Sequence, residues 1–173
     1  MRRLFFLILL PILNAQAAQP SNEAIFSCLM DYSVSSGVIL KPLATNEIYE
    51  QENYKSAYKA SYYFKAGGKD IGYAEKKGQY GIIYAGDIYP IDSAKRLLKT
   101  RLSPSQFNPF VADWSKVRDA NGIYICVSFN VYGIGPGIGF QKNRAGYLLS
   151  ASALKRSRIL FFISADTALF KGN

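Results

Sequence analysis

One missing residue type limits the chemistry that this chain can perform. Its 173 residues include no histidine, so it cannot build a Ser-His or Cys-His nucleophile or a metal site with imidazole ligands. A Ser-x-x-Lys spacing, which puts a hydroxyl and an amine on one face of a helix, occurs twice. The pairs are Ser56 with Lys59 and Ser152 with Lys155. The Ser-Asp-Asn and Lys-Thr-Gly elements that accompany this spacing in Ser/Lys enzymes are missing, so both pairs are better interpreted as solvated surface residues.

Paired carboxylates are the other route to catalysis, since a glycosidase needs two of them facing each other across a cleft. Glu47 and Glu50 have the spacing of helix neighbours and are expected to form a solvated face. The remaining candidates lie close to Gly, Asn or Ser, where aspartate commonly caps or turns the chain. They are Asp87, Asp92, Asp113, Asp119 and Asp166. No motif selects a catalytic pair, so the sequence favours a non-enzymatic protein and predicts no cofactor and no metal.

Residues 133–140 form the most unusual local pattern, Gly-Ile-Gly-Pro-Gly-Ile-Gly-Phe. Four alternating glycines leave one side of the backbone bare, so a ligand, a partner strand or another part of the fold could approach it closely. The pattern lacks the features of a nucleotide-binding loop. A bend or bulge is the simpler interpretation. The functional alternative is a binding surface that also uses the two cations that follow: Gly133, Gly135, Gly137, Gly139, Lys142 and Arg144.

The first 17 residues predict an export signal. Arg2 and Arg3 precede an apolar run over 4–13, and Ala15-Gln16-Ala17 is a suitable cleavage pattern, so we expect cleavage after Ala17 and a periplasmic or secreted protein. The apolar run is too short to span a bilayer, so no transmembrane helix is expected after the signal is removed. In an oxidising compartment, the only two cysteines, Cys28 and Cys126, are most simply explained as one disulfide.

Positive charge is the main clue to partners. The formal net charge is +9, which favours anionic partners in general. Basic residues gather in two short groups and more loosely over 65–77; the groups are Lys95, Arg96, Lys99 and Arg101, and Lys155, Arg156 and Arg158. They could hold an anionic envelope polymer, or they could simply keep an aromatic-rich protein soluble. Nucleic acid is not expected around an exported protein.

The elements that must position these residues are short. Ser21 or Asn22 can cap a helix that runs to Met30, and Thr45 suggests a second helical start. Asp92 or Ser93 can cap a further helix over 94–102, where leucines form an apolar stripe. Tyr- and Ile-rich segments separated by glycine pairs predict an antiparallel meander. Its strands are expected near 58–66, 70–75, 80–85 and 87–91.

The C-terminal half is expected to contain two further strands. Prolines frame a loop that carries the single tryptophan, Trp114. Strict alternation over 123–132 predicts a central strand, and the apolar run over 159–163 predicts a buried one. The whole pattern predicts an α+β fold in which residues 18–173 form a single domain. It would have a mostly antiparallel sheet, two or three short helices and one disulfide.

Three classes of protein agree with these features. The first is a small exported non-enzymatic protein that binds another exported or envelope protein, such as an inhibitor or an immunity-type protein. The second is a module that binds envelope glycans, lipid head groups or other polyanions. The third is a structural envelope subunit, pilin-like or a small outer-membrane barrel. The small size, the disulfide and the absence of a catalytic motif favour the first class.

Overall fold

In the part of the chain that the structure describes, two sheets pack against each other and one helix lies on the outside. The computed structural model describes residues 17–45, 47–52, 54–55, 58, 60–98, 107, 112–131 and 143–166. Six strands form one sheet, in the order β1 (Ile39–Pro42), β8 (Asp113–Asp119), β9 (Gly122–Asn130), β10 (Asn143–Ser150), β11 (Leu160–Asp166) and β7 (Lys95–Arg96). Five strands form the other, in the order β2 (Tyr49–Gln51), β3 (Ala60–Ala66), β4 (Lys69–Lys76), β5 (Gln79–Tyr84) and β6 (Asp87–Pro90).

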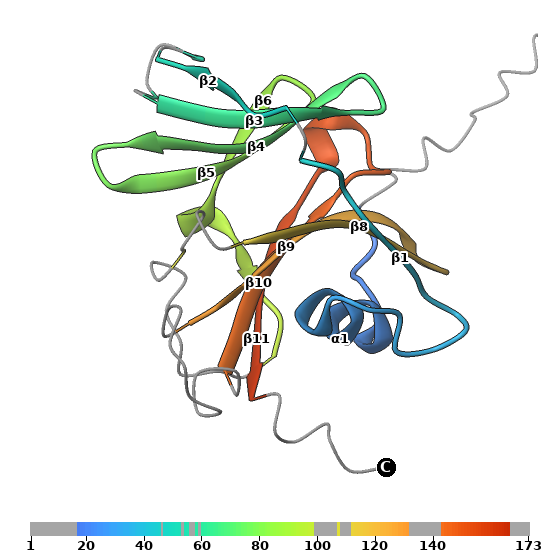
Figure 1. Cartoon of the computed structure of the whole chain (residues 1–173). Coiled ribbons are helices and arrows are strands. Elements are labelled where there is room, and N and C mark those ends of the chain that lie inside the picture. The colour runs from blue at the N-terminus through green and yellow to red at the C-terminus, as the bar shows by residue number, and fades with distance from the viewer. Residues whose placement is uncertain are drawn as a thin grey trace, which may run out of the picture.

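The layers run from the five-stranded sheet through the six-stranded sheet to helix α1 (Asn22–Met30), as Figure 1 shows. The inner faces of the two sheets share one apolar core, which includes Phe64, Ile82, Val127 and Tyr147. A second core lies between α1 and the outer face of the six-stranded sheet. Each sheet therefore buries its inner face, and the six-stranded sheet also buries much of its outer face.

The predicted meander is confirmed. Each of its three hairpins turns on two residues, 67–68, 77–78 and 85–86. Both residues of every turn have positive φ, for example Lys77 at 50° and Gly78 at 78°, as a type I′ turn requires. This local turn chemistry sets the register of strands β3 to β6.

Strand β9 is the predicted central strand, and both of its faces pack against other elements of the fold. Ile125 and Val127 point into the core between the sheets, whereas Tyr124 and Cys126 belong to the core under α1. The disulfide between Cys28 and Cys126 is confirmed and fastens α1 to this strand, with the two Cα atoms 5.7 Å apart.

The N-terminal residues that follow the expected cleavage site are also held against this sheet. The Tyr124 hydroxyl donates to the Ala18 carbonyl over 3.0 Å, and the Ser21 amide donates to Asp119 Oδ2 over 2.8 Å. Ser21 then caps α1 by accepting from the Ala24 amide at 3.1 Å. The segment that leads into α1 therefore lies beside the β8–β9 turn.

Helix content is lower than expected, because α1 is the one α-helix among the described residues. The prediction of a helix over 94–102 is wrong for residues 94–98. Asp92 lies in a 3₁₀ turn, η1 (Ile91–Ser93), and Lys95 and Arg96 pair in parallel with β11. Leu97 continues this contact by donating its amide to the Phe162 carbonyl. Tertiary pairing has overridden the helical spacing of the leucines.

Two further expectations fail for the same reason. The helical start at Thr45 is wrong, since Tyr49 and Gln51 lie in β2 and pair with β3. The expected loop position of Trp114 is also wrong, because it lies in β8, opposite Val127 of β9. The mostly antiparallel architecture itself is confirmed, with β7–β11 as the parallel exception among the described pairs.

Candidate functional site

The edge of the five-stranded sheet carries a group of aromatic side chains that lies partly at the surface. Ile48, Tyr49, Tyr54, Tyr62 and Tyr63 make up this group, which we call the tyrosine surface. Tyr49 and Tyr63 stack with ring centroids 5.5 Å apart, and Tyr54 leans on Tyr63 at 5.2 Å. Ile48 is 64% exposed and Tyr49 is 39% exposed, so these apolar groups remain open to a partner.

The pairing of β2 with β3 brings the rings together. Tyr49 lies directly opposite Tyr63 in the register, so their side chains leave the sheet on the same face. Tyr62 points to the other face, where it stacks on Tyr73 at 5.2 Å. The two sides of one short sheet edge are therefore both aromatic.

Hydrogen bonds from the tyrosine hydroxyls fix the ring positions. Tyr49 donates to Glu47 and Tyr62 donates to Glu50, each over 2.9 Å. Tyr54 donates to Asp70 Oδ2 over 2.8 Å. Rings held in this way lose little conformational freedom when a partner packs on them.

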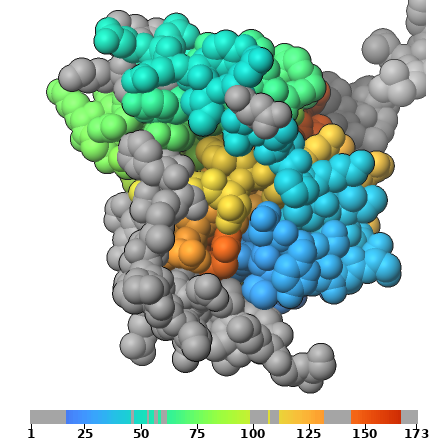
Figure 2. Space-filling view, in the orientation of Figure 1, coloured from blue at the N-terminus to red at the C-terminus, as the bar shows by residue number. Residues whose placement is uncertain are grey.

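A hollow of about 290 Å³ lies where the five-stranded sheet meets β8, on the Tyr62 face of the β2–β3 edge and opposite the Tyr49–Tyr63 stack. Its walls include Ile48, Tyr62, Tyr73 and Trp114. Figure 2 shows the face on which the teal atoms of β2 and β3 lie above the yellow atoms of β8. An apolar side chain of a partner would find aromatic contacts on several sides there.

Tyr54 and Asp70 keep their ordinary charge state at neutral pH. Burial and the hydrogen bond to Asp70 raise the pKa of Tyr54, so its phenol stays protonated. Burial raises the pKa of Asp70, but hydrogen bonds from Lys65 and Tyr54 outweigh it and hold the pKa below its usual range.

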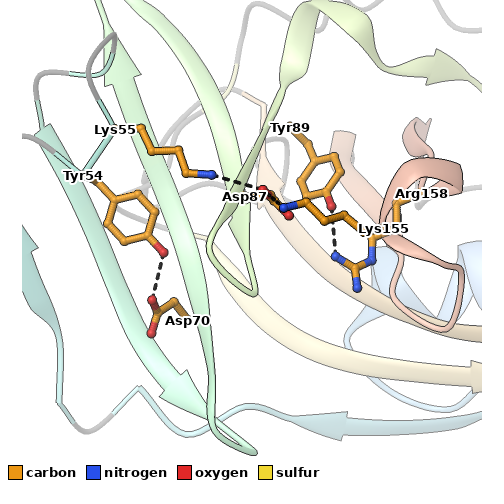
Figure 3. Close-up of polar contacts among 7 residues, drawn as sticks. All are labelled: Tyr54, Lys55, Asp70, Asp87, Tyr89, Lys155 and Arg158. Atoms are coloured by element: carbon orange, nitrogen blue, oxygen red, sulfur yellow. Dashed lines mark hydrogen bonds and ion pairs between the residues drawn. The ribbon is translucent and has the colours of Figure 1, made fainter.

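A polar cluster at the opposite edge of the same sheet connects the two sheets (Figure 3). Asp87 Oδ1 accepts from Lys155 over 2.8 Å and from Lys55 over 3.1 Å. Arg158 donates to the Tyr89 hydroxyl over 3.1 Å. Lys155 belongs to the 3₁₀ turn η5 (Lys155–Ser157) between β10 and β11, so Asp87 joins the β10–β11 connection to β6. Its charge is already balanced by two lysines, and the cluster supports the fold.

Replacing Asp87 with asparagine is expected to lower the free energy of unfolding by about 1 kcal/mol at pH 7, since both lysines are largely exposed. Hydrogen bonding by Lys155 is the main cause that holds the Asp87 pKa below its ordinary value. Its contribution is therefore full above about pH 4, the unfolded value, and is lost as the pH falls through the lower folded value. Urea unfolding of both proteins across this pH range measures the difference.

The control for this prediction is Asp92→Asn, because Asp92 is exposed and has no ion pair among the described residues. Its unfolding free energy should stay close to that of the parent at each pH. A difference between the parent and Asp87→Asn that stays constant to the lowest pH would contradict the role given to Asp87.

Arg144 is the one predicted binding residue that the structure describes. It lies on β10 and faces α1, where it donates to Asp113 Oδ2 and to Ser128 Oγ, each over 2.7 Å. Its side chain is 18% exposed. The other five predicted binding residues lie outside the described residues: Gly133, Gly135, Gly137, Gly139 and Lys142.

Comparison of the chain with family models, curated proteins and solved structures gives no match. In the described part of the chain, no three residues of the Cys, Asp and Glu types gather as a metal site would require. No helix in the same part has the length and apolar character needed to cross a bilayer. The geometry of the surface is therefore the basis for a functional proposal.

The spacing of the tyrosines in the sequence does not identify them as a site. Tyr54, Tyr58 and Tyr62 are spaced by four, which nearly satisfies both a helical and an extended period. The ring contacts depend on which strand Tyr49 pairs with, and that pairing is a tertiary property. In the sequence, only the high content of 13 tyrosines indicates an aromatic surface.

Proposed function

We propose that this protein is an exported, non-enzymatic binding protein that recognises another exported or envelope protein through its tyrosine surface. An inhibitor or an immunity-type protein fits this description. The observation that carries the proposal is that both faces of the β2–β3 edge are aromatic: Tyr49 stacks on Tyr63 on one face, and the exposed Ile48 borders an aromatic hollow on the other. Rigid, partly exposed aromatic groups of this kind dominate the energetics of protein interfaces.

Protein is the best partner class for this surface because the surface combines an apolar hollow with hydroxyl and carboxylate groups at its rim. The hollow, with Trp114 and Tyr73 in its walls, suits an inserted apolar side chain. Glu47 and Glu50 at the rim can accept hydrogen bonds from the partner. An apolar centre with a polar rim is the usual anatomy of a protein interface.

The disulfide supports the exported location, since such bonds persist in oxidising compartments and are rare in the cytosol. Residues 1–16 lie outside the described part of the chain, so the export signal with cleavage after Ala17 remains a proposal from the sequence.

The test is a binding experiment with the oxidised protein from residue 18 onward, immobilised and exposed to envelope and secreted extracts. Salt is raised from about 0.05 to about 0.5 M to remove partners held by screened charge. We expect one protein to be retained in stoichiometric amounts at high salt. The double variant Ile48→Ser, Tyr49→Ser should weaken its retention about thirtyfold, the effect of losing an interface hot spot.

The matched control is Tyr32→Ser, because Tyr32 is 54% exposed and lies just after α1, away from the tyrosine surface. It should bind the retained protein as the parent does. Equal retention by the double variant would overturn the assignment to the tyrosine surface. Retention of heterogeneous glycan or lipid that is lost as the salt rises would overturn the proposed function.

A further inference from the structure

A second pocket lies at a different part of the space between the two sheets. It has a volume of about 370 Å³, and both sheets contribute to its wall. We propose that this pocket binds an amphiphile with one aliphatic chain and an anionic head group, a carboxylate or a phosphate. This site does not depend on the tyrosine surface and would add a ligand to a protein that also binds a partner.

The inner part of the pocket is apolar. Ile71 and Tyr84 line it from the five-stranded sheet, and Ile125 lines it from the six-stranded sheet. These side chains are 2%, 4% and 4% exposed, respectively. Leu43 and Ala66 add further apolar surface. A hydrocarbon chain that enters between the sheets would therefore exchange water for side chains of the main core.

The mouth of the pocket is cationic, with one lysine from each sheet. Lys69 stands at the start of β4 and Lys116 in the middle of β8. Lys69 Nζ donates to the Tyr84 hydroxyl over 3.0 Å and lies 5.2 Å from the centre of that ring. Its ammonium group is thus held beside the pocket, where an anionic head group can reach it.

The position of Lys116 is unusual for its strand. The β8–β9 register places it opposite Ile125, on the face that Trp114 and Val127 use to enter the core. An apolar residue would continue that pattern, yet a lysine stands there. The apolar stem of Lys116 can line the pocket while its charge remains at the mouth.

Positive charges are concentrated around this mouth. Lys41 of β1 lies directly opposite Lys116, and Arg118 follows two residues later on the same face of β8. Like charges directly opposite each other in a sheet are destabilising. Among the described residues, neither Lys69 nor Lys116 has a carboxylate within ion-pair distance. An anion bound at the mouth would relieve this repulsion.

Ser152 adds a neutral donor at the same rim. Its Oγ accepts from the Ile123 amide over 3.1 Å, which leaves the hydroxyl hydrogen to donate to a head group. The adjoining Gly67 has φ of +56° and nothing within 4 Å of the position of a Cβ, so the rim is open beside Lys69. The pocket thus combines a dry interior with converging donors at its entrance.

The test is isothermal titration of the oxidised protein with three amphiphiles of equal chain length, with the anions below their micelle-forming concentrations and the alcohol below its solubility limit. The probes are dodecanoate, dodecyl phosphate and dodecanol. We expect one-to-one binding of at least one anion, and its preference over the other identifies the head group. The neutral alcohol should bind at least tenfold more weakly. A separate series of shorter carboxylates, from octanoate to decanoate, tests the apolar interior. Each added methylene should tighten binding about fourfold.

Variants separate this pocket from general surface charge. The double variant Lys69→Gln, Lys116→Gln should weaken binding of the preferred anion about tenfold without changing the thermal midpoint by more than a few degrees. The matched control is Lys76→Gln, an exposed lysine at the other end of β4. Three results would overturn the proposal. They are an equal loss of affinity in Lys76→Gln, equal binding of dodecanol and the anions, and binding to anionic vesicles without binding to the monomeric amphiphiles.

Discussion

Replacing both Cys28 and Cys126 with alanine is expected to lower the free energy of unfolding by about 4 to 5 kcal/mol, the chain-entropy value for a loop of this size. The bond closes a sequence separation of 98 residues, so its removal greatly enlarges the freedom of the unfolded chain. Net stability of a domain is only about 5–15 kcal/mol. Urea unfolding monitored by Trp114 fluorescence measures the loss of stability. The free energy of unfolding should also fall more steeply with urea concentration, because the unlinked chain exposes more surface when it unfolds.

The control for this prediction is the parent protein unfolded in urea with a reductant, which should match the double variant closely. Both cysteines are fully buried, so reduction of the folded protein should be slow and should follow its unfolding. A double variant within about 1 kcal/mol of the oxidised parent would contradict the expected cross-linking effect.

Replacing Gly72 with alanine is expected to cost about 3 kcal/mol or more, and valine should prevent folding of the five-stranded sheet. A Cβ at this position would meet the Tyr62 carbonyl oxygen and would lie 2.6 Å from the Tyr63 Cα. Both contacts are with backbone, which cannot rotate away as a side chain can. Because Gly72 pairs with Tyr63 in the β3–β4 register, relief of the contact requires the strands to separate. Urea unfolding measures the loss.

Gly37→Ala is the matched control, since the nearest atom to its Cβ would be Ser35 Oγ at 3.9 Å. Its stability should stay within about 0.5 kcal/mol of the parent. A similarly small effect of Gly72→Ala would mean that β3 and β4 tolerate a wider separation than the structure has. The Gly72 variant also tests the tyrosine surface, because Tyr62 and Tyr63 would move with β3.

The parts of the fold that could be predicted from sequence are those set by neighbouring residues. Helix α1 has a serine cap, and the turns at 67–68, 77–78 and 85–86 each contain glycine. Strand β9 was predictable because its alternation is strict. The disulfide was predictable because the chain has two cysteines.

The parts that failed depend on distant pairing. Lys95 and Arg96 have a helical context, but their partners in β11 lie more than sixty residues further along the chain. Strand β10 was missed, although Tyr147, Leu148 and Leu149 are all fully buried. The segment Asn143–Ser150 has neither the strict alternation of β9 nor the long apolar run of β11, so no pattern in it predicted a strand.

The two sites were harder still to predict. The tyrosine surface requires the pairing of Tyr49 with Tyr63, and the second pocket requires Lys69 and Lys116 from different sheets. Neither combination has a spacing that a linear motif could carry. The predicted glycine-rich surface over 133–139, by contrast, was visible in the sequence and remains a prediction.

The attachment of the N-terminal segment to β8 and β9 has a consequence for the order in which the chain can fold. Helix α1 is synthesised before its core partners, because Val117, Tyr124, Leu148 and Phe161 lie far along the chain, in β8 to β11. Cys126, the disulfide partner of Cys28 in α1, lies on β9. The helix must therefore remain without its packing until these strands have been synthesised, and we expect contacts so distant in sequence to make folding slow.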